Sequence, residues 1–304
     1  MSSLRGCAGR RRPGPRRARA WLILIGVGCS PPKGAWRDQW VFVADDGGVL
    51  ALGVDRAPDG TAEAKGWLGL GGSWGGCFYH RFGVPTADRD DAAAVVRALT
   101  ASGAAPVRAS LDERDGRVEI RLRTPQAALR LVAESTRRLG RTNDPEGETV
   151  YDVGRARLRR EGVVRDGWLV VERTPRERPH RPAVDYGDFV SVVIANAGRG
   201  PVVMKRSLGV RGFDHALVKD GAGRRTTVVR ATVARGSLAL DLPELGLHMA
   251  PKILDRIRSD GHGPDGTPLA YDVLLLGGDG EWAGVAFTIR RARRAAAPLG
   301  RPAS

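Results

Sequence analysis

The sequence predicts a mainly β, antiparallel fold, and two observations support that prediction. Short runs of aliphatic, β-branched and aromatic residues alternate with polar residues at the period of two that half-buried strands require. Asp-Gly pairs, which readily adopt the positive φ angles of tight reversals, occur eight times, several of them between such runs. Repeated strand–turn–strand units favour a meander of antiparallel strands over strand–helix–strand crossovers.

The middle of the chain shows the alternation most clearly. Residues 149–159 place apolar side chains on one face and Arg155, Arg157 and Arg159 on the other, as in a strand with one wet side. The pair Asp166-Gly167 predicts a tight reversal, and aromatic and β-branched residues follow it at 168–172. We therefore predict a hairpin at mid-chain, between two β-rich halves of similar length.

The first half combines further hairpins with few helices. Its expected strands include residues 40–44, 49–54, 107–111 and 118–122. A helix is expected over 90–99, which begins with acidic residues and is followed by Gly103. Residues 124–139 fit either a helix capped by Thr124 or a strand followed by a loop.

The second half repeats the same pattern after a charged, proline-containing segment at 174–182, which we interpret as a linker. Its expected strands cover residues 189–194, 201–204, 226–229, 238–240, 271–276 and 282–289. A short helix is expected over 251–258, because Ile253, Leu254 and Ile257 have helical spacing. The predicted domains are 39–174 and 183–290, and a basic, disordered tail follows at 291–304.

The N-terminus predicts a targeting segment. Arginines between Arg5 and Arg19 precede a short apolar run at 21–28, which is too short to span a bilayer but typical of a signal peptide at 1–28. The tetrapeptide Gly26-Val27-Gly28-Cys29 resembles a bacterial lipobox. That resemblance implies acylation of Cys29, a tether at 29–38, and a lipoprotein of the cell envelope, anchored in the outer membrane. The alternative is a disordered basic leader on a cytoplasmic protein.

Cysteine content and charge narrow the class of protein. With Cys7 removed and Cys29 acylated, Cys77 would be the last free cysteine, so no intrachain disulfide is expected. The net charge is +15, but seven arginines lie in residues 1–28 and five in 290–304, which leaves 15 − 7 − 5 = +3 for residues 29–289. A body so nearly neutral predicts no concentrated basic face and no nucleic-acid partner.

The densest cluster of aromatic and glycine residues lies at 71–80. We expect Trp74, Phe78 and Tyr79, together with Trp168, to line a cavity for an apolar small molecule. The alternative is a tight loop that enters a core strand, since aromatic residues commonly fill β cores.

No residue set identifies a catalytic or metal site. Cys77 and His80 have the spacing of half a zinc site without a second pair, so neither metal nor cofactor is predicted. Ser73 matches a nucleophile elbow only literally, because no α/β pattern surrounds it. Further polar candidates, each also explained by a solvated loop or turn, are His180, Asp185, Tyr186, Asp214, His215, Asp260, His262 and Asp265.

The strand order and turn placement of this chain resemble those of a known family. Residues 147–173 and 268–294 look like the corresponding parts of the tandem lipocalin-like proteins, which include the AttH family and the hydroxyneurosporene synthases. The resemblance implies two β-barrels or half-barrels around an apolar cavity. The expected function is that of an exported, lipid-anchored carrier of a lipid- or isoprenoid-like ligand. The alternatives are a hydratase or isomerase on the same scaffold, and a ligand-free scaffold of the cell envelope.

Overall fold

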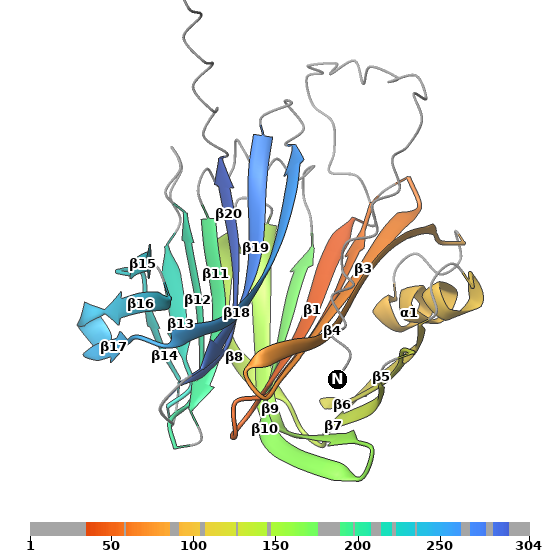
Figure 1. Ribbon diagram of the computed structural model, residues 1–304, viewed down its shortest axis with the longest axis horizontal. Helices are drawn as coiled ribbons and strands as arrows, with labels where there is room; N and C mark the ends of the chain where they lie inside the picture. The colour runs from red at the N-terminus through yellow and green to blue at the C-terminus, as the bar shows by residue number, and fades with distance from the viewer. Residues whose placement is uncertain are drawn as a thin grey trace, which may run out of the picture.

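The chain folds into two antiparallel sheets of ten strands each, both curled into half-barrels (Figure 1). This computed structural model describes residues 35–57, 59–85, 91–103, 107–125, 127–144, 147–175, 189–196, 198–207, 214–220, 223–234, 236–262, 268–277 and 282–291. The predicted mainly β class is confirmed, and so is the arrangement of paired half-barrels that the lipocalin-like resemblance implies.

The first sheet is built from the N-terminal half. Its strands are β1 (Trp36–Ala44), β2 (Val49–Arg56), β3 (Thr61–Leu70), β4 (Ser73–Gly83), β5 (Arg108–Arg114), β6 (Arg117–Arg123), β7 (Ala128–Ala133), β8 (Arg137–Asp144), β9 (Gly147–Arg160) and β10 (Val163–Pro175). They lie in the order β4-β3-β2-β1-β10-β9-β7-β6-β5, and β8 pairs with β9 beside β7.

The second sheet has a similar topology. Its strands are β11 (Phe189–Asn196), β12 (Gly200–Ser207), β13 (His215–Val218), β14 (Arg224–Thr226), β15 (Arg230–Ala234), β16 (Ser237–Leu242), β17 (Leu247–Met249), β18 (Lys252–His262), β19 (Pro268–Gly277) and β20 (Ala283–Arg291). Their order is β14-β13-β12-β11-β20-β19-β18-β16-β15, and β17 pairs with β16. In each half the first strand pairs with the last, β1 with β10 and β11 with β20, which places both at the middle of a sheet whose edge strands are β4 and β5 in the first half and β14 and β15 in the second.

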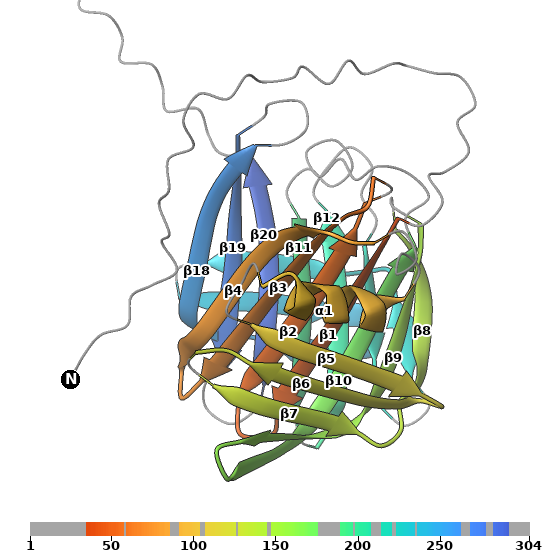
Figure 2. The ribbon, with the colours of Figure 1, turned by 90° about the vertical axis from the view of Figure 1, so that its right-hand side faces the viewer.

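Helix α1 (Ala92–Ala101) confirms the helix expected near residue 90. Asp91 caps it by accepting a hydrogen bond from the backbone N–H of Ala93. The helix buries Val95, Val96 and Leu99 against the first half-barrel, beside β5 (Figure 2). Within the described part of the chain, no helix is both long enough and apolar enough to cross a bilayer.

Period-two alternation divides the buried side chains among three cores. One core fills each half-barrel, and the third, which we call the seam, lies where the two sheets pack together. Strand β1 shows the division, because Trp40 and Phe42 point into the first half-barrel while Val41 and Val43 belong to the seam. The central strands of both sheets are therefore buried on both faces.

The central hairpin forms, but its reversal lies elsewhere than predicted. The chain turns at Glu161-Gly162, where both residues have positive φ, as a type I′ turn requires. Asp166-Gly167 lies inside β10. Gly167 is required there because β1 approaches closely, and a Cβ atom at this position would lie 2.2 Å from the Val43 carbonyl oxygen.

Two segments for which the sequence allowed or predicted a helix are strands. Residues 124–139 take the strand alternative, since β7 and the start of β8 occupy them. The helix expected over 251–258 is wrong, because these residues lie in β18, which pairs with β19 and carries a bulge between Ile253 and Asp255. The expected linker is described only at Thr174 and Pro175, which end β10.

Candidate functional site

The four side chains predicted to bind a ligand divide among three environments. Trp74 and Trp168 pack against the seam. Phe78 packs against the core of the first half-barrel. Tyr79, the next residue of β4, is 61% exposed. Trp74 and Trp168 thus share one environment, and the other two lie apart from them.

The seam leaves two indole donors unused. Both Trp74 Nε1 and Trp168 Nε1 are buried without a hydrogen-bond partner among the described residues. A buried donor without an acceptor costs about 1–3 kcal/mol, and such groups in native structures call for an explanation such as a water or a ligand. The two tryptophans therefore mark places where the seam could accept a hydrogen-bond acceptor from outside the chain.

Aromatic and aliphatic side chains surround these donors. Across the seam, the rings of Trp67 and Phe287 lie 5.3 Å apart between centroids. The backbone N–H of Trp74 donates to Asp255 Oδ2 of β18 at 2.9 Å, which ties the edge of the first sheet to the second. The guanidinium of Arg155 lies 5.0 Å from the centroid of the Trp168 ring.

A second part of the seam holds a buried polar cluster. Lys205 Nζ of β12 donates to Glu172 Oε1 of β10 at 2.6 Å, with side-chain exposures of only 1% and 5%. Arg37 donates to the same carboxylate oxygen at 3.2 Å. Lys205 also lies 5.6 Å from the centroid of the Tyr151 ring, whose hydroxyl is 3.5 Å from Nε2 of His215. An amine, a carboxylate, a phenol and an imidazole are thus gathered between the sheets.

Sequence reasoning missed this cluster. Tyr151 and Glu172 lie in the central stretch, and His215 was considered only as an isolated residue. The sequence indicated no role for Lys205, which is only a charged residue at the end of an apolar run. That contrast was the available clue, because a charge within a strand buried on both faces must find a partner.

Inside the first half-barrel, the carboxyl of Asp38 has a raised pKa. Burial raises the pKa of its carboxyl to about 7, although the nearby Arg173 lowers it. The neighbouring carboxylates, of which Glu113 has the largest effect, also raise the pKa. Arg173 bridges Glu113 and Asp152 with hydrogen bonds of 2.9 and 2.7 Å, so its charge is shared among three acids. Asp38 is consequently a carboxyl that can be protonated near neutral pH.

A narrow apolar crevice lies in the first half-barrel. Its lining includes Leu50, Trp67, Leu68, Phe78, Leu122 and Leu129, and its volume is about 20 Å³. That is room for roughly one water molecule. A ligand of lipid size would have to displace side chains here.

The remaining candidates do not assemble into a site. Cys77 takes part in a disulfide whose partner lies outside the described residues, which contradicts the expectation of no intrachain disulfide and removes its thiol as a metal ligand. His80 stacks on Phe82, with ring centroids 6.1 Å apart. Ser73 follows a turn between two strands and donates to the Leu70 carbonyl, which is not an elbow geometry.

Only some of the other polar candidates lie among the described residues. Asp260 and His262 lie in β18, and Asp214 pairs with Arg206 at 3.8 Å. The other candidates, His180, Asp185, Tyr186 and Asp265, and the lipidation candidate Cys29, lie outside the described residues. Over the part of the chain that is described, no three His, Cys, Asp or Glu side chains are grouped to hold a metal ion.

The pKa of Asp38 predicts a pH dependence of stability. Because its folded pKa is raised to about 7 from an ordinary value near 4, the folded state holds a proton that the unfolded state has lost between these values. The free energy of unfolding should therefore fall as pH rises from about 4 to about 7, by up to about 4 kcal/mol. Urea unfolding of the Asp38→Asn variant should show a smaller fall over this range, and the same pH slope in both proteins would contradict the assignment.

Among known proteins, this chain matches solved structures only. No family model matches the chain, and no curated protein matches it. The chain is similar to an AttH protein from Nitrosomonas europaea, with 12% identity, a TM-score of 0.48, and coverage of 84% of this chain and 91% of that chain. It is also similar to kievitone hydratase from Nectria haematococca, with 9% identity, a TM-score of 0.47, and coverage of 85% and 89%. A third similar structure is CghA with Sch210972, with 13% identity, a TM-score of 0.40, and coverage of 84% and 88%.

Proposed function

We propose that this protein binds an apolar small molecule at the seam between its two sheets. The observation that carries the proposal is the pair of buried, unpartnered indole donors of Trp74 and Trp168, both of which pack against the apolar residues of the seam. Such a surface suits a ligand that is largely hydrocarbon and carries a hydrogen-bond acceptor, as lipids and oxidised isoprenoids do.

Two physical effects would provide the affinity. Removing apolar ligand surface from water contributes about 25 cal/mol per Å². A hydrogen bond from a buried indole N–H adds about 1 kcal/mol, and it also relieves the cost of a donor without an acceptor. The polar cluster around Lys205 and Glu172 is already paired internally, so it supports the frame of the seam more than it offers free bonding groups.

Replacing the indole donors tests the proposal. Trp74→Phe and Trp168→Phe keep an aromatic ring but remove the N–H, so each should weaken binding by roughly five- to tenfold. Native mass spectrometry and titration with fatty acids and carotenoids measure the bound fraction. Trp282→Phe is the matched control, because Trp282 packs in the core of the second half-barrel.

Stability provides an independent readout of the same variants. Because the indole donors have no partner among the described residues, their removal should not lower the ligand-free melting temperature more than Trp282→Phe does. A protein that stays empty with every lipid and carotenoid offered would contradict ligand binding and favour the scaffold alternative. Equal binding by all three variants would move the site away from the seam.

Asp38 favours a second candidate function, that of a hydratase or isomerase acting on a double bond. A carboxyl with a pKa of about 7 can donate a proton to one alkene carbon at neutral pH. In hydration, water then adds to the other carbon and its proton returns to the carboxylate. In isomerisation, a proton leaves a neighbouring carbon instead, so atoms and charge balance in both reactions.

Isotope incorporation tests this second candidate. In deuterated water the wild-type protein should introduce deuterium into an unsaturated isoprenoid, measured by mass spectrometry, and Asp38→Asn should lower the rate at least 100-fold. Asp59→Asn changes an exposed turn residue and serves as the control. Equal rates for Asp38→Asn and the wild type would exclude Asp38 as the acid.

We also propose that the protein is exported to the cell envelope and acylated at Cys29. The support is the order of a basic region, an apolar run and a lipobox-like tetrapeptide in residues 1–29.

Metabolic labelling with palmitate tests the anchor. Cys29→Ser should abolish the label, whereas Cys77→Ser should retain it. Unchanged labelling in Cys29→Ser would contradict acylation at that position, and so would an equal loss of label in both variants.

A further inference from the structure

The outer face of β5, β6, β7 and β9 carries a dense array of arginines. The array, which we call the arginine face, consists of Arg108, Arg121, Arg123, Arg130, Arg157 and Arg159. All six are exposed, because the intervening residues of each strand point into the first half-barrel. This face contradicts the expectation from net charge that the body of the protein lacks a concentrated basic surface.

Strand register sets like charges directly opposite one another. Arg108 pairs with Arg123 across β5 and β6. Arg121 pairs with Arg130, and Arg130 pairs with Arg159, which forms a row of three arginines across β6, β7 and β9. Like charges in directly opposed positions destabilise a sheet, so this arrangement costs stability unless an anion covers it.

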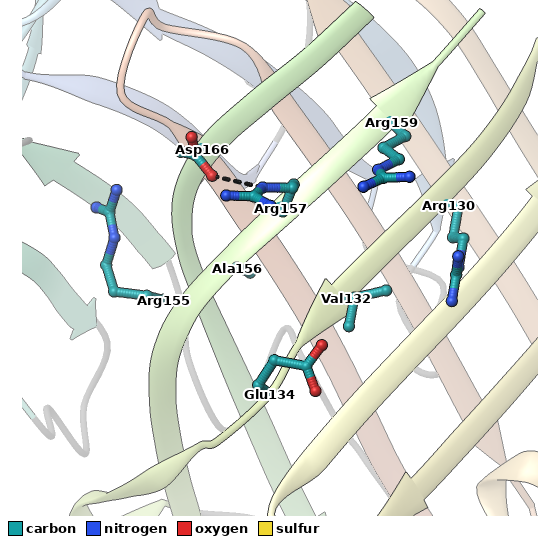
Figure 3. A pocket seen from close by; sticks show the side chains of 8 residues that line it. All are labelled: Arg130, Val132, Glu134, Arg155, Ala156, Arg157, Arg159 and Asp166. Atoms are coloured by element: carbon teal, nitrogen blue, oxygen red, sulfur yellow. Dashed lines mark hydrogen bonds and ion pairs between the residues drawn. The ribbon is translucent and has the colours of Figure 1, made fainter. Parts of the chain in front are cut away.

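The acidic groups on this face do not balance the arginines. Glu119 accepts hydrogen bonds from Arg130 at 2.9 Å, Arg121 at 2.7 Å and Arg117 at 2.8 Å, which lower its pKa to about 2. Glu134 also pairs with Arg117, at 3.1 Å. Asp166 pairs with Arg157 at 3.0 Å (Figure 3). In the described part of the chain no carboxylate pairs with Arg108, Arg123 or Arg159, so the face keeps an excess of positive charge.

Two shallow depressions run along the arginine face and meet at Arg130. One, of about 300 Å³, lies between β7, β9 and β10, and Figure 3 shows Arg130, Arg157 and Arg159 along it. The other, of about 330 Å³, lies over β5 and β6 and is lined by Arg108, Arg121 and Arg123. The surface can thus receive several anionic groups side by side.

An apolar hairpin tip adjoins these charges. Val163 and Val164, at the start of β10, are 56% and 48% exposed. Val164 lies directly opposite Arg159 on β9. Because β1 pairs with β10 only from Gly167 onwards, this end of the hairpin extends past β1 (Figure 1). Exposed apolar residues beside a row of arginines are the combination with which peripheral proteins enter the headgroup region of a bilayer.

We propose that the arginine face and the Val163-Val164 tip dock this protein onto an anionic phospholipid bilayer. The arginines bind the headgroup phosphates, and the two valines enter the boundary between headgroups and acyl chains. A single-stranded nucleic acid fits the surface less well, because such binding relies on exposed aromatic side chains. Among the described residues the one large exposed aromatic is Tyr79, on β4, outside this face. The docking surface is independent of the seam and goes beyond the proposed ligand binding.

Vesicle binding of the full-length chain tests the proposal. The chain carries Cys29→Ser, so that no acyl group contributes, and the vesicles contain phosphatidylcholine with or without phosphatidylglycerol. We expect binding to the anionic vesicles only, weakened by added salt. Arg108→Gln, Arg123→Gln and Arg159→Gln together should lower the partition coefficient about fivefold per charge, or roughly 100-fold in total.

Matched controls separate this face from overall charge. Arg230→Gln, Arg256→Gln and Arg258→Gln remove three exposed charges from the second sheet and should leave binding within about twofold of the parent chain. Val163→Ser with Val164→Ser should weaken binding that persists at high salt, whereas Val228→Ser, at an exposed valine between β14 and β15, should not. Thermal unfolding confirms that each variant is folded.

Three results would overturn the proposal. The first is equal binding to neutral and anionic vesicles. The second is an equal loss of binding in the two triple-arginine variants, which would assign the attraction to net charge and to the arginine-rich termini. The third is duplex or single-stranded nucleic acid that binds more tightly than the anionic vesicles and depends on Arg108, Arg123 and Arg159, which would make the face a nucleic-acid surface.

Discussion

The buried ion pair between Lys205 and Glu172 is the interaction on which the packing of the two halves depends. One partner comes from each sheet, and neither side chain has more than 5% of its surface exposed. Removing either partner would leave a desolvated charge at a cost of about 3–5 kcal/mol. Any sliding of one sheet over the other would separate the charges, so the pair restricts the seam to one register in a way that interchangeable apolar contacts do not.

That fixed seam explains why the central strands are apolar on both faces. In β1 and β11, alternate side chains enter a half-barrel while the others enter the seam, so burial continues without a wet side. A chain built this way fills its half-barrels largely with apolar side chains and places the Lys205–Glu172 cluster at the join. The unpartnered indoles of Trp74 and Trp168 are consistent with this division, since both lie against the seam rather than within a half-barrel.

The sequence could predict what depends on neighbours along the chain. Alternation placed Arg155, Arg157 and Arg159 on an exposed face, as the structure has them. It could not separate helix from strand where Ile253 and Ile257 are four residues apart, because that spacing satisfies both periods and a bulge alters the strand register there. Nor could it pair Lys205 with Glu172, because contacts between two separately formed sheets leave no periodic signal in either one.

The net charge wrongly predicted that the body has no basic face, because it does not record where each charge lies in the fold. A sum over residues 29–289 treats every charge as equally placed, whereas the fold sorts charges by face. Several carboxylates of the first half, including Asp38, Glu113 and Asp152, lie close to Arg173, where they cannot offset charge on the outer surface. The arginines that alternate with core residues in β5 to β9 pair with acids only in part, since Glu119 and Asp166 bind Arg121, Arg130 and Arg157 while no described carboxylate pairs with Arg108, Arg123 or Arg159. A nearly neutral body can therefore present a strongly basic side, and the strands that build the first half-barrel core are the ones that create it.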